Sequence, residues 1–186
     1  DADSLWAHVM VGLGYQRINY AVDQAVSNLE QAQVLDPAFS QLYRELAKGY
    51  ANLLQGRPAL SSWYRFRAAT APRIDNEAQN YIEWLLQVRI DTPRQNAYVS
   101  GQLNITGTAD RDLFQFYKLE YQPINSTDDT WFMIGEAVYH KVDKGQLGTW
   151  LTSQLPAGKY RIRLTVVDPT GNYSPSDEIT VRVTGQ

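Results

Sequence analysis

The chain has 186 residues, of which 44% are hydrophobic and 12% aromatic, enough for one large packed core or two modest ones. Its formal net charge of −3 and pI near 5.4 argue against binding along a phosphate backbone, because such binding requires clustered cations. Cysteine is absent, which excludes disulfides, thiolate catalysis and cysteine-ligated metal centres. We therefore expect a folded chain that does not bind nucleic acid.

The start of the sequence carries no targeting signal. It begins at Asp1 without an initiating methionine, a basic segment or an apolar leader, and no run of eighteen apolar residues follows. We therefore expect a fragment or a processed mature form. Membrane association would then come only through an anchor upstream of residue 1 or through a partner.

Helical signals fill the first half of the chain, where apolar residues recur at three- and four-residue spacing. Asp36-Pro37 is typical of an N-cap followed by the first helical position, and predicts a helix to about Leu54. Gly56 is expected at the C′ position, where positive φ is tolerated, with Pro58 in the first turn of the next helix. A hairpin of two helices is expected before Asp36.

Two further helices are expected between Pro58 and Ile90. The first carries Leu60, Trp63, Tyr64 and Ala68, and Pro72 ends it. Asp75 is the expected N-cap of the second, and Glu77 in its first turn is favoured by the helix dipole. This fifth helix is predicted to run to about Ile90.

From Thr92-Pro93 onward the apolar spacing changes to period two. The clearest strand spans residues 159–168, with Tyr160, Ile162, Leu164 and Val166 on one side. Further strands are expected within residues 97–110, 114–121, 131–138, 145–153 and 179–183. Six or seven short strands separated by turn residues predict a β-sandwich.

The predicted fold class is therefore multidomain α and β. A helical repeat domain is expected over residues 1–91, a linker over residues 92–96, and an antiparallel β-sandwich over residues 97–186. Because the linker is short and contains Pro93, it should hold the domains in a preferred orientation.

The two predicted hairpins close on prolines, Pro37 and Pro72, at the spacing of a stacking helical repeat. Each resembles a tetratricopeptide repeat, and the helix after Asp75 resembles the capping helix of such arrays. The residues that carry the resemblance are Val11, Gly12, Tyr15, Ala25, Leu29, Ala32 and Pro37 in the first, and Leu46, Ala47, Tyr50, Ala59, Trp63 and Pro72 in the second. The resemblance spans about residues 5–90 and implies a concave surface that holds another chain. A plain pair of α-hairpins is the alternative.

The strand half resembles the bacterial immunoglobulin-like and fibronectin type III-like modules of cell-envelope proteins. The resemblance rests on the segment from Leu155 to Tyr160 and on the turn from Asp168 to Asn172. It implies that Tyr160 packs at a corner, with its hydroxyl bonded back to nearby backbone. It also implies an extracytoplasmic location in the bacterial envelope or at the cell surface, and it brings no catalytic residues.

The candidate binding residues are Arg44, Lys48 and Asn52, which recur every four residues along one predicted helix, with Arg17 and Gln41 extending the patch. In the repeat family this helix face lines the groove. Arginine can hold a carboxylate through two hydrogen bonds and lysine can add a point charge, so a protein partner with an acidic peptide or C-terminus is the expected ligand. The alternative is that these residues are solvated and neutralised by Glu45 and other nearby acids.

Nothing in the sequence predicts catalysis, a cofactor or a metal. The two histidines, His8 and His140, lie far apart, and no nucleophile, phosphate-binding or zinc motif occurs. The acidic pairs in Asp110-Arg-Asp112 and Asp128-Asp129 are interpreted as turns, with calcium binding left open.

The sequence thus favours a non-enzymatic protein interaction or scaffold subunit of a bacterial cell-envelope assembly. Two alternatives remain open. One is an accessory module of an envelope enzyme, such as a peptidoglycan synthase or protease, whose catalytic domain lies outside this chain. The other is a sandwich that binds carbohydrate, for which an exposed strip of aromatic side chains would be the sign.

Overall fold

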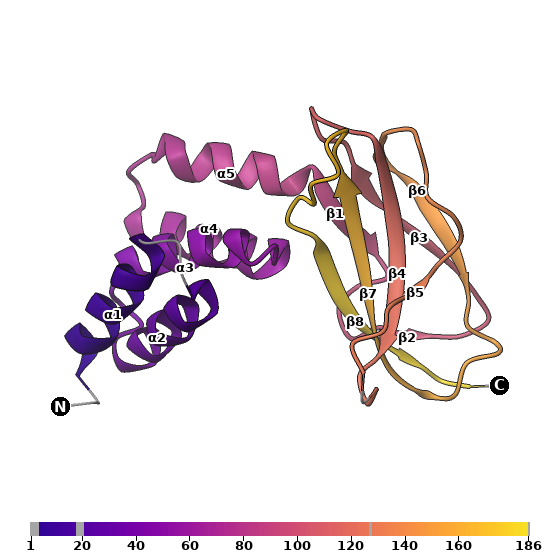
Figure 1. The fold of residues 1–186 in the computed structure, drawn as a ribbon, viewed down its shortest axis with the longest axis horizontal. Coiled ribbons are helices and arrows are strands. Elements are labelled where there is room, and N and C mark those ends of the chain that lie inside the picture. Colours follow the sequence, from indigo (N-terminus) through magenta and orange to yellow (C-terminus); the bar gives the residue numbers. More distant parts are fainter. Residues whose placement is uncertain (1–3, 18–20, 127, 186) are drawn as a thin grey trace. The chain divides into compact units, whose positions relative to one another are not determined.

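A computed structural model describes residues 4–17, 21–126 and 128–185. The chain forms two compact units, Asp1–Leu85 and Leu86–Gln186. The first is helical and the second is a β-sandwich (Figure 1). This order confirms the predicted fold class. Among the described residues, no helix has both the length and the apolar character needed to cross a membrane.

The helical unit is a chain of hairpins in which neighbours in sequence are neighbours in space. Its extensive contacts join α1 to α2, α2 to α3, and α3 to α4. Its helices are α1 (Leu5–Arg17), α2 (Val22–Leu35), α3 (Ser40–Asn52), α4 (Gly56–Thr70) and α5 (Asn76–Leu86). The helix pairs predicted from apolar spacing are thus present.

Small residues allow these helices to approach closely. A Cβ atom on Gly12 of α1 would lie 2.7 Å from Cγ of Leu29, and one on Gly49 of α3 would lie 2.6 Å from Cγ2 of Val26. Both distances are below van der Waals contact, so glycine is required for the observed spacing. The rings of Trp63 in α4 and Tyr81 in α5 stack with centroids 5.0 Å apart, which attaches the last helix.

The helix boundaries predicted at Asp36-Pro37 and at Gly56 differ from those of the structure. The third helix begins at Ser40 rather than directly after Asp36, because the Asp36 carboxylate accepts a hydrogen bond from the Ala38 amide and closes a turn that contains Pro37. Gly56 is the buried first residue of α4 and not a C′ residue, and the positive φ of 60° falls on Leu54 instead.

Other helix-end predictions are confirmed. α4 ends at Thr70, two residues before Pro72. The Asp75 carboxylate accepts a hydrogen bond of 2.9 Å from the Ala78 amide, as an N-cap should. A further hydrogen bond holds the loop before α3 against that helix: the Tyr43 hydroxyl donates to the Pro37 carbonyl at 2.6 Å.

The second unit contains two sheets. One has the strand order β1-β3-β6 and the other β2-β8-β7-β4-β5. Pairing is antiparallel except between β2 and β8, which are parallel. The strands are β1 (Val88–Thr92), β2 (Tyr98–Val99), β3 (Gln102–Ala109), β4 (Phe116–Pro123), β5 (Phe132–Met133), β6 (Val142–Leu151), β7 (Gly158–Val167) and β8 (Asp177–Val183).

The first strand corrects the predicted domain boundary. The fifth helix ends at Leu86, and Val88–Thr92 pairs with β3 as part of the sandwich. The expected linker, residues 92–96, therefore belongs to the second unit. Val88 continues the helical spacing of α5, but buried Val88 and Ile90 alternate with exposed Arg89, which is the pattern of a strand.

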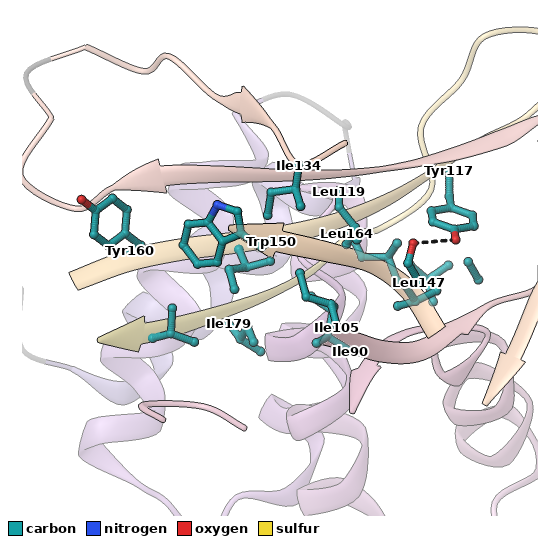
Figure 2. Close-up of a cluster of buried hydrophobic side chains, with 14 of the residues drawn as sticks. Ile90, Ile105, Tyr117, Leu119, Ile134, Leu147, Trp150, Tyr160, Leu164 and Ile179 are labelled. Atoms are coloured by element: carbon teal, nitrogen blue, oxygen red, sulfur yellow. Dashed lines mark hydrogen bonds between the residues drawn. The ribbon is translucent and has the colours of Figure 1, made fainter. Parts of the chain in front are cut away.

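The core lies between the two sheets and consists of large apolar residues, many of them β-branched (Figure 2). The predicted inward residues of β7 are all buried, namely Tyr160, Ile162, Leu164 and Val166. Polar contacts also cross the core. The Tyr117 hydroxyl donates to the Leu147 carbonyl at 2.8 Å, and the Ile90 amide donates to the buried Asp177 carboxylate at 2.7 Å.

Candidate functional site

The predicted cations of α3 converge on one carboxylate. Arg44 and Lys48 lie one turn apart on α3, and Glu77 stands in the first turn of α5. Lys48 Nζ is 2.9 Å from Glu77 Oε1, and Arg44 Nη2 pairs with Glu77 Oε2. Each carboxylate oxygen thus has its own cation. We call these three residues the carboxylate clamp.

The clamp holds Glu77 in its charged form. Partial burial raises the pKa of Glu77, but Lys48 and Arg44 outweigh this effect and hold the pKa below its usual value. About one third of each of the three side chains is exposed. Arg44 Nε is buried and has no hydrogen-bond partner in the described part of the chain, so the guanidinium keeps an unused donor.

Two of the other three candidate residues flank the clamp on α3, with Gln41 about one turn before Arg44 and Asn52 one turn after Lys48. Arg17 is the last residue of α1, and all three are exposed. The acid that neutralises Arg44 and Lys48 is Glu77, and not the neighbouring Glu45 considered in the sequence. Glu77 was assigned only a dipole role because it lies 33 residues from Arg44.

Tyr160 makes the contact that the sandwich resemblance implies. Its hydroxyl donates to the Pro156 carbonyl, four residues upstream, at 2.8 Å. Its ring packs against Trp150 and Tyr121 in the core, at centroid distances of 5.9 and 6.1 Å. The residue therefore fastens the turn before β7 to the core, and its role is structural.

The histidines and acidic loops make local contacts. Nδ1 of His8 is 3.1 Å from the Asn28 side-chain oxygen. Asp110 pairs with Lys141 at 2.8 Å, and the Asp128 carboxylate accepts from the Ser126 hydroxyl at 2.7 Å. Within the described residues, no group of three or more His, Asp or Glu side chains is placed to hold a metal ion.

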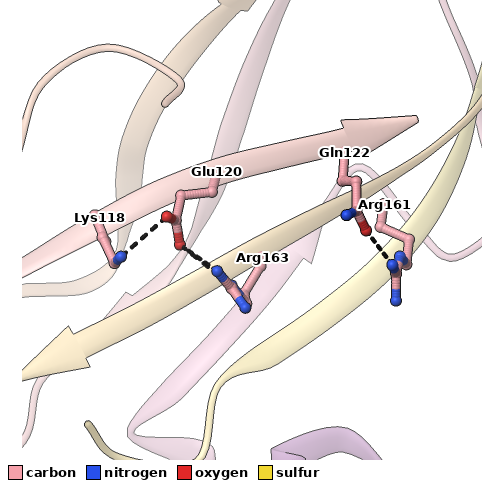
Figure 3. A network of polar contacts seen from close by, with 5 residues as sticks. All are labelled: Lys118, Glu120, Gln122, Arg161 and Arg163. Carbon is pink, nitrogen blue, oxygen red and sulfur yellow. Dashed lines mark hydrogen bonds and ion pairs between the residues drawn. The ribbon is translucent and has the colours of Figure 1, made fainter. Parts of the chain in front are cut away.

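A second polar cluster lies on the outer face of the five-stranded sheet, and the sequence did not predict it (Figure 3). Glu120 of β4 accepts from Lys118 at 2.9 Å, and its second oxygen accepts from Nε and Nη2 of Arg163 at 3.2 and 2.9 Å. Arg161 pairs with the Gln122 side-chain oxygen and lies 3.5 Å from Glu178.

Trp131 lies against this cluster. Its ring centroid is 3.9 Å from the guanidinium carbon of Arg163 and 5.2 Å from that of Arg161. Glu120 and Gln122 are only 6% and 1% exposed although they belong to the outer face. The arginine–tryptophan cluster is the name we give to the set Lys118, Glu120, Gln122, Trp131, Arg161 and Arg163. Its signal in the sequence was the alternation of Arg161 and Arg163 with core residues, which places both on one face.

The chain has structural neighbours among solved proteins, each at low sequence identity. No protein-family model matches the chain, and no curated protein matches it. The solved structure of fibronectin(III)-like modules of Clostridium thermocellum CbhA is similar at 18% identity and a TM-score of 0.33, over 52% of this chain and 94% of that one.

Two enzyme structures are similar at the same level. An endo-beta-1,4-mannanase from Thermotoga petrophila matches at 15% identity and a TM-score of 0.35, over 61% of this chain and 25% of that one. A family 76 glycoside hydrolase from a Bacteroides thetaiotaomicron strain matches at 12% identity and a TM-score of 0.33, over 52% of this chain and 20% of that one. The chain thus spans a quarter or less of either enzyme.

The fold itself defines the class of protein. A three-stranded sheet packs on a sheet that contains β4, β7 and β8, and a corner tyrosine fastens the turn before β7. The chain is a helical unit followed by a mainly antiparallel sandwich of the fibronectin type III-like kind.

Proposed function

We propose that this chain is a non-enzymatic interaction or scaffold subunit that holds an acidic segment of a partner protein on its helical unit. The observation that carries the proposal is the convergence of Arg44 and Lys48 on a single carboxylate. Two cations spaced one helical turn apart can bind the carboxylate of a partner side chain or C-terminus as they bind that of Glu77.

Glu77 occupies the place that the ligand carboxylate would take. It belongs to the same unit as Arg44 and Lys48, so in the free protein it satisfies their charge. A partner acid would displace Glu77 or share the two cations with it.

The arrangement of the helices supports a repeat-like binding surface. Contacts follow sequence order from α1 to α4, and Gly12, one of the residues that carry the tetratricopeptide resemblance, lets α1 approach α2 closely. In such an array the first helix of each hairpin lines the groove. Arg17, Gln41 and Asn52, which are exposed on α1 and α3, would then contact the segment on either side of its carboxylate.

The proposed setting is the bacterial cell envelope, outside the cytoplasm. The resemblance of the sandwich to modules of envelope proteins supports this location. In the same setting the chain could serve as the accessory module of an envelope enzyme whose catalytic domain lies elsewhere. The docking role of the clamp is the same in both cases.

Peptide binding tests the proposal directly. A fluorescein-labelled oligoglutamate peptide with a free C-terminus is titrated with the full chain, and fluorescence anisotropy is followed. We expect binding by the wild type and its loss in the double variant R44E/K48E. The matched control is R67E/R73E, which makes the same charge change at exposed positions of the helical unit and should bind as wild type. Equal binding by R44E/K48E and wild type would overturn the proposal.

A further inference from the structure

The outer face of the five-stranded sheet is basic although the chain is acidic. The inward residues of β4, β7 and β8 are buried in the core, so the alternate residues point outward. The outward charged residues are the cations Lys118, Lys159, Arg161, Arg163 and Arg182 and the acids Glu120 and Glu178. Five cations against two carboxylates leave an excess of three positive charges, whereas the whole chain carries −3.

Both acids are already counted in this excess, and both pair with cations of the same face. Glu120 is buried beneath its three hydrogen bonds from Lys118 and Arg163. Burial raises the pKa of Glu178, and Arg161 and Arg163 offset that effect only in part. Lys159 and Arg182 are paired across β7 and β8 and are exposed, so their charges face the solvent.

Aromatic rings accompany the cations on this face. Tyr98 of β2 is 73% exposed and its ring lies 5.8 Å from the Arg182 guanidinium carbon. Tyr173 is 52% exposed and its ring lies 5.3 Å from Lys118 Nζ. The Trp131 ring lies over Arg161 and Arg163 of β7. In the sheet, β7 lies between β8, whose Arg182 contacts Tyr98, and β4, whose Lys118 contacts Tyr173. From β2 to β4 the sheet spans three strand spacings, about 14 Å.

We propose that this face binds an acidic polysaccharide, a polymer of sugar rings that carry carboxylates. Aromatic rings pack against the C–H faces of sugars, and arginine and lysine side chains pair with the carboxylates. The charge of the face complements the polymer. β7 is paired with β4 over residues 160–167 and with β8 over residues 158–164, so the centre of this face offers no free strand edge to which a peptide could add.

This inference is independent of the carboxylate clamp, which lies in the other unit. Affinity electrophoresis in native gels tests it with the full chain and polygalacturonate in the gel, with dextran as the neutral polymer and polyglutamate as the acidic peptide. We expect retardation by polygalacturonate that decreases with added salt, and none by dextran. Because polyglutamate can also bind the clamp, its gel is run with the R44E/K48E variant as well.

Two double variants distinguish the sheet face from charge alone. K159A/R182A should lose most of the retardation by polygalacturonate, and Y98A/Y173A should weaken it several-fold without changing the net charge. The control R89A/K141A removes two cations elsewhere on the sandwich and should behave as wild type. R44E/K48E should still be retarded by polygalacturonate.

Three results would overturn the inference. The first is that polygalacturonate does not retard the wild type, and the second is that K159A/R182A is retarded as strongly as the wild type. The third is that polyglutamate retards R44E/K48E as strongly as polygalacturonate does, while Y98A/Y173A behaves as the wild type. The last result would mean that the face attracts any polyanion and does not recognise sugar rings.

Discussion

The two units of this chain are stabilised in different ways. In the helical unit, contacts join helices that follow one another in sequence, and glycines set the spacing between them. In the sandwich, contacts join distant segments, such as the bond from the Ile90 amide to Asp177, 87 residues away. Local sequence pattern therefore determines the first unit, whereas large apolar residues and strand pairing between distant segments determine the second.

The units also differ in how they arrange charge. The helical unit concentrates two cations on the single carboxylate of Glu77. The sandwich spreads its cations over a sheet face and backs them with aromatic rings. The first arrangement suits one carboxylate at a defined point, and the second suits an extended polyanion.

The largest expected effect is loss of the sandwich core. Ile162 is fully buried in β7, and Ile162→Ala should lower the free energy of unfolding of the sandwich by about 2–5 kcal/mol, because it removes apolar contacts and leaves a cavity. Urea denaturation followed by amide NMR, in which residues of the two units are observed separately, checks this. The helical transition should stay in place. An equal shift of both transitions would show that the two units unfold as one.

Helix spacing gives the next largest effect. Gly12→Ala puts a methyl group 2.7 Å from Leu29 Cγ and should destabilise the helical unit by about 1–3 kcal/mol through overpacking. The matched control is Gly14→Ala in the same helix, where nothing lies within 4 Å. That change should stabilise the unit by up to about 1 kcal/mol, because alanine favours a helix over glycine. Equal effects of the two variants on the helical transition would refute the proposed close packing.

The corner hydrogen bond of the sandwich is expected to contribute less. Tyr160→Phe removes the donor to the Pro156 carbonyl and should cost about 0.5–1.5 kcal/mol. Tyr98→Phe serves as control, since its ring is exposed on the outer face. Thermal unfolding of the two variants should differ, with Tyr98→Phe close to wild type.

The smallest effect concerns the pH dependence of the helical unit. Because the pKa of Glu77 is lowered on folding, its ion pairs stabilise the unit above the unfolded-state pKa. This stabilisation is lost as the pH falls through the folded-state pKa. For a partly exposed pair, roughly 0.2–1 kcal/mol is expected. Glu77→Gln should remove this part of the acid dependence in urea titrations at acidic and neutral pH. An unchanged acid dependence would mean that the ion pairs contribute nothing measurable.

Much of the fold followed from local patterns. The apolar spacing of the helices, the cap at Asp75 and the alternation along β7 each reflect a preference within a few residues, and each was predicted. The strand β1 was missed because Val88 satisfies both the helical and the strand period. Gly56 was misplaced because the required positive φ is adopted by Leu54.

The candidate site was predicted only in part, for a physical reason. The four-residue spacing of Arg44 and Lys48 places both on one side of α3, and this is a local property. Their partner Glu77 comes from a later helix, and its approach depends on the packing of α5 on α4 through Trp63 and Tyr81. Likewise, the Trp131 contact with β7 requires a register that no local pattern contains.

The most direct test of the central claim is the effect of Glu77→Gln on peptide binding. If Glu77 occupies the place of the ligand carboxylate, its neutralisation frees Arg44 and Lys48. The anisotropy titration with oligoglutamate should then show tighter binding by the variant than by the wild type. Unchanged or weaker binding by a folded Glu77→Gln variant would contradict the account.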